Sequence, residues 1–247
     1  MASERDIDLS AYAYDTFVAE HEAQLKAANV PPHLWQRVWH KLTQQIFDAG
    51  SAFVFGELED APEGTLGAFT AEGTQLAPEG DVFLIDHAWT FPSMAVARKQ
   101  LAASAPLLER ISAMMTLPPP PPVDAADAAD NADREAAVEA VMKRLYRFGW
   151  LLEFVGKEAD AADIVATTRL QNYFVLDELG SRFGEADDDN DEPQNFAMEP
   201  LFFEPQQCAY SLCWPVREVG EFERARHARK VCFSSTSPSS SSSCANR

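Results

Sequence analysis

The sequence predicts a mixed α+β fold, in which an N-terminal helical hairpin packs on a β-rich domain with inserted helices. Three observations lead to this prediction. Apolar residues recur at helical spacing in the first fifty positions, short aromatic and β-branched runs follow, and helical spacing then alternates with further strand-like runs. The chain has 247 residues, of which 46% are hydrophobic, so it can bury a sizeable core in one large domain or two small ones.

The first fifty residues predict two amphipathic helices. Residues 1–8 carry mixed charge without an apolar run, so we expect a flexible N-terminus and no secretory signal. Ser10 is a suitable N-cap for the first helix, which should end before Pro31. The second helix is expected over residues 31–50 and closes at Gly50. The two apolar stripes are Tyr14, Phe17, Val18, His21 and Leu25, and then Trp35, Val38, Trp39, Leu42 and Ile46.

From residue 53 to residue 90 the pattern changes from helix to strand. The apolar runs AFVFGEL and DVFLIDH are separated by a segment rich in Gly, Glu and Pro, which suits a hairpin or an irregular loop. In the stretch DVFLIDHAWTF, the unbroken run from Val82 to Ile85 predicts a central strand covered on both faces. A turn should follow, with Asp86 bonded locally and Trp89 packed. We therefore expect Asp86→Asn to cost about 1–2 kcal/mol of stability.

Helical spacing returns over residues 93–115, with a break expected at Pro106. Residues 118–133, which begin with five prolines and continue with Ala and Asp, predict an extended, solvated linker inside the domain. Another helix is expected after this linker. Its apolar stripe consists of Val138, Val141, Met142, Leu145, Phe148 and Leu152.

The last part of the chain predicts three more strands and two solvated segments. The run NYFVLDEL at residues 172–179 reads as a covered strand, and LFFEPQQCAYSLCW reads as two short strands interrupted by Pro205. Residues 185–194 are rich in carboxylates that repel one another, so we expect a loop. Residues 220–247 are first basic and then Ser-rich, which predicts a disordered tail with or without a binding role of its own.

The charge and the cysteines restrict the classes of partner. The formal net charge of −19 disfavours nucleic acid and anionic membranes and leaves basic protein surfaces as better candidates. Because no run of 18 apolar residues occurs, no membrane-spanning helix is expected. The four cysteines, Cys208, Cys213, Cys232 and Cys244, lack metal-type spacing, so we expect free thiols and a cytoplasmic, or also nuclear, location.

No residue qualifies for a catalytic, cofactor-binding or metal-binding role. The sequence contains neither a phosphate-binding glycine motif nor the zinc-protease or nucleophile-elbow motifs. Asp86 and His87 are neighbours on a strand, as are Asp177 and Glu178, so each pair should point to opposite faces. His21 lies on an apolar stripe, which favours a satisfied core histidine. We expect no cofactor.

Four stretches are more specific together than apart. They are VPPHLWQRVWHKLTQQIFDAG (30–50), VFLIDHAWTF (82–91), VLDELGSRF (175–183) and PLFFEPQQCAYSLCWPVREV (200–219). In order and spacing they resemble the N-terminal, SET-like half of the tubulin–tyrosine ligase-like protein 12 family, over residues 9–219. The residues that mark these motifs are Trp35, Trp39, Asp86, His87, Trp89, Asp177, Arg182 and Trp214.

This resemblance implies a SET-like mixed α/β domain without the ATP-grasp ligase half, so ligase activity is the weakest reading. Active SET methyltransferases carry an Asn-His motif at the S-adenosylmethionine site and a catalytic tyrosine near the C-terminus. Here no Asn-His dipeptide occurs, and neither Tyr173 nor Tyr210 lies in a matching motif.

We therefore expect a non-catalytic interaction or regulatory module, a pseudoenzyme, with tubulin- or chromatin-associated protein partners by family analogy. The alternative is a diverged S-adenosylmethionine-dependent lysine methyltransferase. The change in character after Val219 also suggests a truncated product or a gene-model junction. The sequence assigns no oligomeric state.

Overall fold

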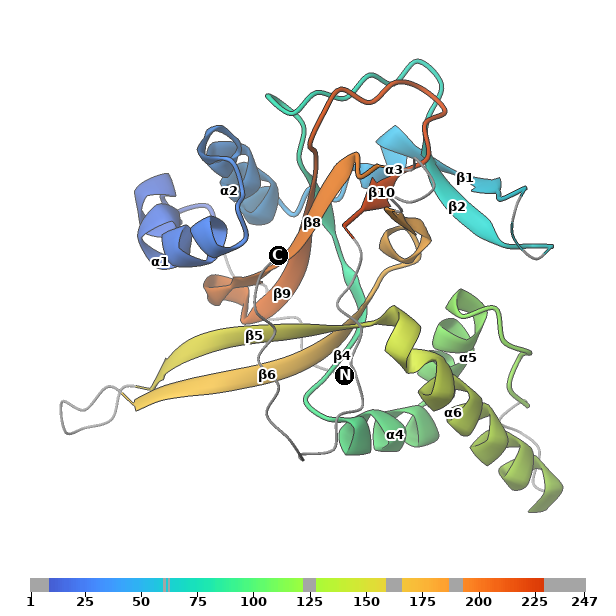
Figure 1. The fold of residues 1–247 in the computed structure, drawn as a ribbon. Helices are drawn as coiled ribbons and strands as arrows, with labels where there is room; N and C mark the ends of the chain where they lie inside the picture. Colours follow the sequence, from blue (N-terminus) through green and yellow to red (C-terminus); the bar gives the residue numbers. More distant parts are fainter. Residues whose placement is uncertain are drawn as a thin grey trace, which may run out of the picture.

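The computed structural model describes residues 9–59, 61, 63–121, 128–158, 166–186 and 193–228, and it confirms the mixed α+β class. Within these residues the strands form two three-stranded and two two-stranded sheets. An N-terminal pair of helices lies at one end of the molecule and a group of three helices lies at the other, with the sheets between them (Figure 1).

The N-terminal pair consists of α1 (Tyr14–Ala27) and α2 (Trp35–Gln44), joined by the 3₁₀ turn η1 (Pro32–Leu34). The expected stripes are correct at their centres, because Phe17, Leu25 and Val38 are fully buried. The expected cap is wrong: α1 begins after Ala13, and its start has no side-chain cap. Tertiary packing of the apolar stripe therefore holds this helix end without capping.

The prediction of one helix over residues 31–50 was also wrong. The helix ends at Gln44 because Gln45 adopts a left-handed conformation, with φ 54°, and the Ile46 N–H donates to the Lys41 carbonyl oxygen at 2.9 Å. This is the hydrogen-bond pattern that usually ends helices at glycine. Gly50 lies instead in the short helix α3 (Ala49–Ala52).

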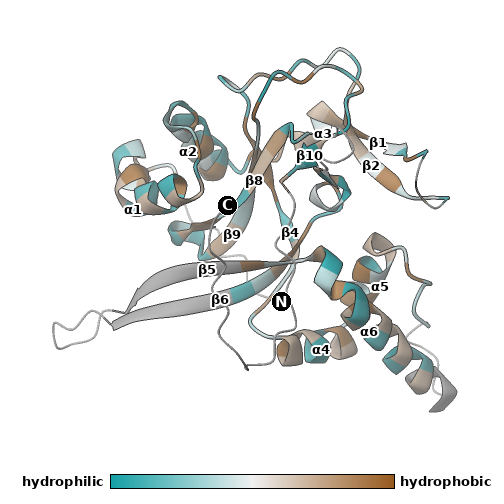
Figure 2. Cartoon of the chain, in the orientation of Figure 1, coloured by the Kyte–Doolittle hydropathy of each residue, from teal (hydrophilic) through white to brown (hydrophobic). Residues whose placement is uncertain are grey.

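The helical pair packs on an antiparallel sheet of three strands in the order β3 (Phe83–Ile85), β9 (Cys208–Pro215) and β8 (Phe196–Phe203). The turn η4 (Glu204–Gln206) joins β8 to β9, so the predicted interruption at Pro205 is confirmed. Figure 2 shows hydrophobic colour along β8, where Leu201 and Phe203 are fully buried against the helices.

A second antiparallel sheet has the order β4 (His87–Phe91), β6 (Ala166–Leu176) and β5 (Gly149–Glu158). The stretch from Val82 to Phe91 therefore changes sheets at Asp86, and both of its strands lie at a sheet edge. The expected single central strand was wrong. Burial on both faces is confirmed, since residues 82–85 are all less than 9% exposed. Helices, not additional strands, provide part of this cover.

Helices α4 (Met94–Ala103), α5 (Ala105–Met114) and α6 (Ala128–Phe148) pack against the second sheet around Leu101, Leu108 and Val141. The break between α4 and α5 is confirmed. The Ser104 hydroxyl there accepts the Leu107 N–H at 3.4 Å. Two boundaries were wrong. Helix α6 begins at Ala128, inside the predicted 118–133 linker, of which residues 122–127 lie outside the described part. Leu152 belongs to strand β5 and not to the predicted helical stripe.

The remaining sheets involve the end of the chain. Strands β1 (Phe53–Glu57) and β2 (Leu66–Thr70) form a hairpin, and β7 (Gly184–Glu185) pairs in parallel with β10 (Arg226–His227). The 3₁₀ turn η2 (Gly180–Arg182) precedes β7. Residues 187–192 of the predicted acidic loop lie outside the described part, and its first residue, Glu185, is in β7.

A disordered tail from residue 220 was wrong for residues 220–228. The Ala225 N–H donates to the Ala68 carbonyl oxygen, and the Gly184 N–H donates to the Ala225 carbonyl oxygen, both at 2.8 Å. These partners are more than 40 residues away in the chain, so no local pattern signals them. Residues 229–247 lie outside the described part.

Cys208 and Cys213, five positions apart on β9, are both free thiols, whereas Cys232 and Cys244 lie outside the described part. Within the described residues, no helix combines the length and apolar character needed to cross a bilayer.

Candidate functional site

Four of the eight marked residues are tryptophans, and all of them have structural environments. The Trp35 Nε1–H donates to the Val30 carbonyl oxygen at 2.9 Å, and the Trp39 Nε1–H donates to the Tyr12 carbonyl oxygen at 3.0 Å. Trp214 is buried on β9 beneath the helical pair. The Trp89 Nε1–H donates to the Gln100 Oε1 at 2.8 Å, so this indole is packed as expected. The Trp89 bond fixes α4 on the second sheet, whereas the Trp35 and Trp39 bonds hold the N-terminal helical region together.

Asp86 and His87 do not act on each other as orienter and base. The exposed Asp86 carboxylate accepts the His87 backbone N–H at 2.7 Å, whereas the His87 ring lies 3.0 Å from the Ser211 Oγ through its Nε2. The ring also stacks on Phe174, with centroids 4.0 Å apart. Burial lowers the pKa of His87 to about 3, so the imidazole is neutral at physiological pH. Because Ser211 is only 1% exposed, this histidine–serine pair offers no accessible nucleophile.

The end of β6 carries a charged cluster. The Asp177 Oδ1 accepts the Gly180 N–H at 2.7 Å, and Glu178 forms a two-pronged ion pair with Arg110 of α5 at 2.7 and 2.8 Å. Burial raises the pKa of Asp177, and the nearby negative charges of Asp86 and Glu178 raise it further. The cluster ties a helix to a sheet end, and each carboxylate has a structural partner. Arg182, in η2, has no side-chain ion pair among the described residues.

His21 is the satisfied core histidine that was expected. Its Nδ1 lies 3.0 Å from the Phe17 carbonyl oxygen, and its Nε2 accepts the Glu204 N–H at 3.3 Å. Burial lowers its pKa. The imidazole thus links α1 to the turn η4, and both ring nitrogens are used.

A cavity with several polar lining residues lies where the C-terminal segment, residues 220–228, pairs with β7. Its volume is about 210 Å³. The described residues that line it are Arg147, Phe148, Trp150, Leu176, Gly180, Ser181, Phe183, Glu185 and His227. The His227 ring is buried, and its centroid lies 5.1 Å from that of Trp150. The lining therefore combines the side chains of Arg147, Glu185 and His227 with aromatic rings, among them that of Trp150.

Sequence reasoning missed this cavity. His227 was placed in a disordered tail, and Trp150 was treated as part of no motif. Asn195 was missed as well, although its amide holds the C-terminal segment: its Nδ2 donates to the Arg224 carbonyl oxygen at 2.8 Å, and its Oδ1 accepts the Arg226 N–H at 2.7 Å. The one available signal was the presence of the isolated apolar residues Phe222 and Ala225 in an otherwise charged segment.

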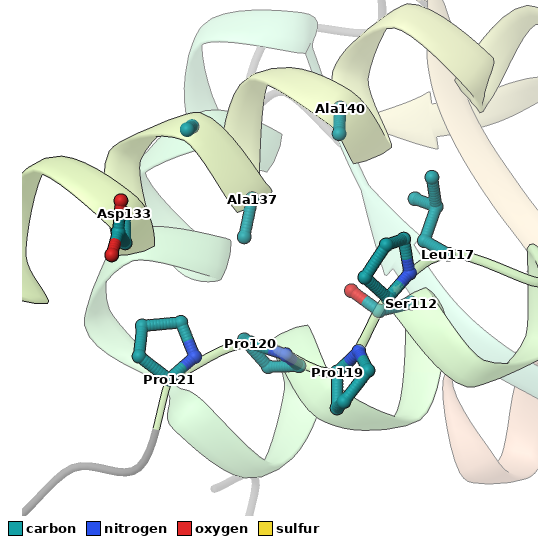
Figure 3. Close-up of a pocket in the computed structure, with 10 residues that line it drawn as sticks. Ser112, Leu117, Pro119, Pro120, Pro121, Asp133, Ala137 and Ala140 are labelled. Atoms are coloured by element: carbon teal, nitrogen blue, oxygen red, sulfur yellow. The ribbon is translucent and has the colours of Figure 1, made fainter.

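A larger cavity of about 400 Å³ lies between the proline run and α6 (Figure 3). Its walls are the rings of Pro118 to Pro121 and the methyl groups of Ala136, Ala137 and Ala140. The Ser112 Oγ is buried beside it and has no partner among the described residues. The described walls are apolar and carry one carboxylate, that of Asp133, so the described lining offers no set of groups for acid–base or nucleophilic chemistry.

Within the described residues, no group of three or more His, Cys, Asp or Glu side chains is arranged to hold a metal ion. The prediction of a loop over residues 185–194 falls largely on residues 187–192, outside the described part.

Comparison with known proteins gives a consistent result. The family model described as the tubulin tyrosine ligase SET-like domain matches residues 68–239. The mouse protein named tubulin–tyrosine ligase-like protein 12 is 30% identical over 232 residues, which cover 85% of this chain and 33% of the mouse protein. The human protein of the same name is 29% identical over 92% of this chain and 35% of its own length.

The protein of that name from Caenorhabditis elegans is 28% identical over 87% of this chain and 37% of its own length. The chain thus spans about a third of the length of the curated relatives that it matches. No solved structure matches it significantly. The family model extends to residue 239 and so includes residues 220–228, whose strand β10 pairs with β7.

Proposed function

The chain belongs to the tubulin tyrosine ligase SET-like domain family, and from this premise we propose that its described domain is a non-catalytic protein-interaction module. The observation that carries the proposal is a set of exposed apolar side chains on β1 and on the adjoining segment at residues 220–228. Val54, Phe55 and Phe222 are 44%, 51% and 60% exposed. Large exposed apolar side chains on neighbouring segments are a feature of protein-binding regions.

The cavity beside β10 supports the non-catalytic reading. An active SET site is expected to present a tyrosine hydroxyl near the C-terminus, whereas the described lining here offers His227, Glu185 and Arg147 and no tyrosine. The cavity volume of about 210 Å³ is also below the roughly 300–1,000 Å³ of typical small-ligand pockets. Binding of S-adenosylmethionine in this cavity would require the surrounding elements to move.

The charge favours basic partners. With a net charge of −19, the chain attracts Lys- and Arg-rich protein surfaces and repels acidic ones. By family analogy these partners are tubulin- or chromatin-associated, and the location is cytoplasmic or nuclear. The relatives are named ligase-like, and the match covers only about a third of their length, so we propose no ligase activity for this chain.

Two titrations test the proposal. Purified tubulin and purified histone octamer are titrated against the chain and against a Val54→Ser/Phe55→Ser/Phe222→Ser variant by biolayer interferometry. We expect one partner to bind the unmodified chain and to bind the variant at least tenfold more weakly. Equal binding to both would remove the hairpin surface from the proposal.

The alternative function is a diverged S-adenosylmethionine-dependent lysine methyltransferase, favoured by the SET-like family and by the cluster of Trp150, Glu185 and His227. Isothermal titration with S-adenosylmethionine separates the two functions. We expect no heat of binding. A saturable heat that disappears in Trp150→Ala, together with methyl transfer to a lysine-rich peptide, would establish the enzyme and overturn the proposal.

A further inference from the structure

We propose that the open edge of β1 binds an extended, lysine- or arginine-containing segment of a partner protein as an added β-strand. This inference rests on the proposed interaction function and names the partner chemistry and the surface. It is carried by three features of the hairpin: the direction of its backbone groups, the exposure of its side chains and its charge.

The backbone register shows which residues of β1 face outward. The Leu58 N–H donates to the Thr65 carbonyl oxygen and the Ala71 N–H donates to the Ala52 carbonyl oxygen. The even-numbered residues of β1 therefore direct their backbone N–H and C=O groups toward β2. In an antiparallel ladder the backbone N–H and C=O groups of the intervening residues point away from the partner strand. Phe55 and Glu57 therefore direct their N–H and C=O groups outward.

Strand β2 cannot accept another strand, because its second edge is already used. The Phe222 N–H donates to the Thr70 carbonyl oxygen at 3.0 Å, and Ala225 bonds Ala68. Among the described residues, the outward groups of Phe55 and Glu57 have no hydrogen-bond partner. The hairpin also projects from the body of the molecule, so an incoming strand has access to β1 (Figure 1).

The side chains of β1 fit this use. Proteins normally protect an open edge with lysine, proline or a bulge, whereas β1 presents Val54 and Phe55, both more than 40% exposed. These two residues point to opposite faces of the strand. An added strand would therefore gain a side-chain contact on each face, with Val54 on one and Phe55 on the other, beside its backbone bonds, which is how strand addition combines affinity with specificity.

The charge identifies the occupant. From residue 42 to residue 97 the chain contains nine Asp or Glu residues and no Lys or Arg. On the hairpin, Glu57, Glu59 and Glu63 are all exposed. A second copy of the chain paired edge to edge would bring two acidic hairpins together, which like-charge repulsion disfavours. A strand with alternating basic and apolar residues instead pairs with the backbone, places its apolar side chains beside Val54 and places its basic side chains beside Phe55 and Glu57, which share the other face.

The test uses the full chain and a fluorescein-labelled ten-residue peptide that alternates lysine and valine, followed by fluorescence anisotropy. The control peptide has the same sequence with N-methyl groups on two non-adjacent valines and two non-adjacent lysines, which removes N–H donors on both edges of the strand and preserves the charge and the residue composition. We expect the first peptide to bind at least tenfold more tightly than the control at 150 mM salt. Equal binding would mean simple charge attraction and would overturn the proposal.

Two variants at one position locate the binding edge. Phe55→Pro removes the outward N–H and keeps the ladder to β2, because proline is tolerated on an edge strand whose N–H faces solvent. Phe55→Ala removes only the ring. We expect Phe55→Ala to weaken peptide binding a few-fold and Phe55→Pro to weaken it at least tenfold, with matched thermal melts. Equal effects of the two variants would show that peptide binding does not use the backbone N–H of residue 55 and would overturn the proposal. If Phe55→Pro does not fold, the comparison with the N-methylated peptide decides the question.

Other occupants give distinct results. A dimer in sedimentation that dissociates in Phe55→Ala would identify a second copy and overturn the partner assignment. Peptide binding that appears only after removal of residues 229–247 would identify the chain's own C-terminal residues as the occupant. Retained binding of tubulin or histone by the Phe55→Pro variant would reject strand addition at β1 and leave the proposed interaction function standing. A heat of binding with S-adenosylmethionine together with methyl transfer would reject the proposed function itself.

Discussion

The backbone N–H of Asp177 donates to the carbonyl oxygen of Asp86 at 2.9 Å. Asp86 is the residue at which the chain leaves β3 and enters β4, and Asp177 follows directly after the end of β6. This bond therefore fixes the point where the two three-stranded sheets meet. The link is made by backbone groups, whereas the side chain of Asp86 is exposed and, among the described residues, bonds only its neighbour His87.

This arrangement lowers the expected cost of changing Asp86. Asp86→Asn should alter the free energy of unfolding by about 0.5 kcal/mol or less, instead of the 1–2 kcal/mol expected from the sequence, because the substitution is on the surface and leaves the backbone link intact. Urea denaturation of the two proteins measures the difference. A loss above about 1.5 kcal/mol would show that the carboxylate itself holds the junction.

His87 should make stability depend on pH. An unfolded histidine titrates near pH 6.5, whereas burial lowers the pKa of His87 to about 3. Between these values the unfolded chain takes up a proton that the folded chain does not, so this group's contribution falls as the pH drops from 7 toward 4, in total by several kcal/mol.

The variant His87→Gln isolates this effect, because glutamine can bond Ser211 and does not titrate. It should be about 1–2 kcal/mol less stable than the unmodified chain at pH 7, where it loses the ring stacked on Phe174. The gap should narrow or reverse at pH 5. Urea melts at pH 7, 6 and 5 measure it, and a gap that is constant with pH would contradict the assignment.

The ion pair between Arg110 and Glu178 should contribute little. Both side chains are about half exposed, at 46% and 50%, so water and salt screen their attraction. A double-mutant cycle with Arg110→Ala and Glu178→Ala should give a coupling of about 0.3–1 kcal/mol that decreases in 0.5 M NaCl. A coupling of 2 kcal/mol or more would indicate that the pair is desolvated in solution.

The junction between the sheets should tolerate no added volume at Gly180. A methyl group there would lie 2.6 Å from the Ile85 Cγ2 and 3.0 Å from the Leu176 Cβ, both buried. Gly180→Ala should therefore cost about 1–3 kcal/mol. Gly50→Ala is the matched control, since nothing lies within 4 Å of the new methyl group and alanine favours the helix. Similar melting temperatures for the two variants would refute the steric account.

The sequence predicted the elements whose signal is local. The stripe around Phe17 and Leu25, the break before Pro106 and the strands on either side of Pro205 all follow from residue spacing within one element. Errors arose where distant contacts decide the structure. Gln45 ends a helix without glycine, and the turn at Asp86 separates two sheets that the apolar run alone could not distinguish.

The candidate site was the least predictable part for the same reason. Trp150, Glu185 and His227 belong to three separate segments, and the parallel pairing of β7 with β10 together with the contact between the His227 and Trp150 rings brings them to one cavity. The order of the segment at residues 220–228 depends on hydrogen bonds to Ala68, Gly184 and Asn195. No periodicity in a charged nine-residue stretch reports such bonds.

Asn195 supplies the strictest test of the ordered C-terminal segment. The residue is fully buried, and its side chain bonds the Arg224 carbonyl oxygen, the Arg226 N–H and the Glu223 carboxylate. Asn195→Ala leaves buried backbone groups without partners and should cost about 2–4 kcal/mol. The Arg226 amide should also lose protection against hydrogen exchange.

Asn195→Asp is the informative companion. It keeps an acceptor for the Arg226 N–H but places a carboxylate beside the Arg224 carbonyl oxygen and Glu223, so it should be strongly destabilising at pH 7 and less so at pH 4.5, where protonation restores a donor. Denaturant unfolding at the two pH values, with hydrogen exchange read at Arg226, measures both effects. If residues 220–228 exchanged freely in the unmodified chain, or if both variants melted as it does, the segment would be a solvated tail, as the sequence alone indicates.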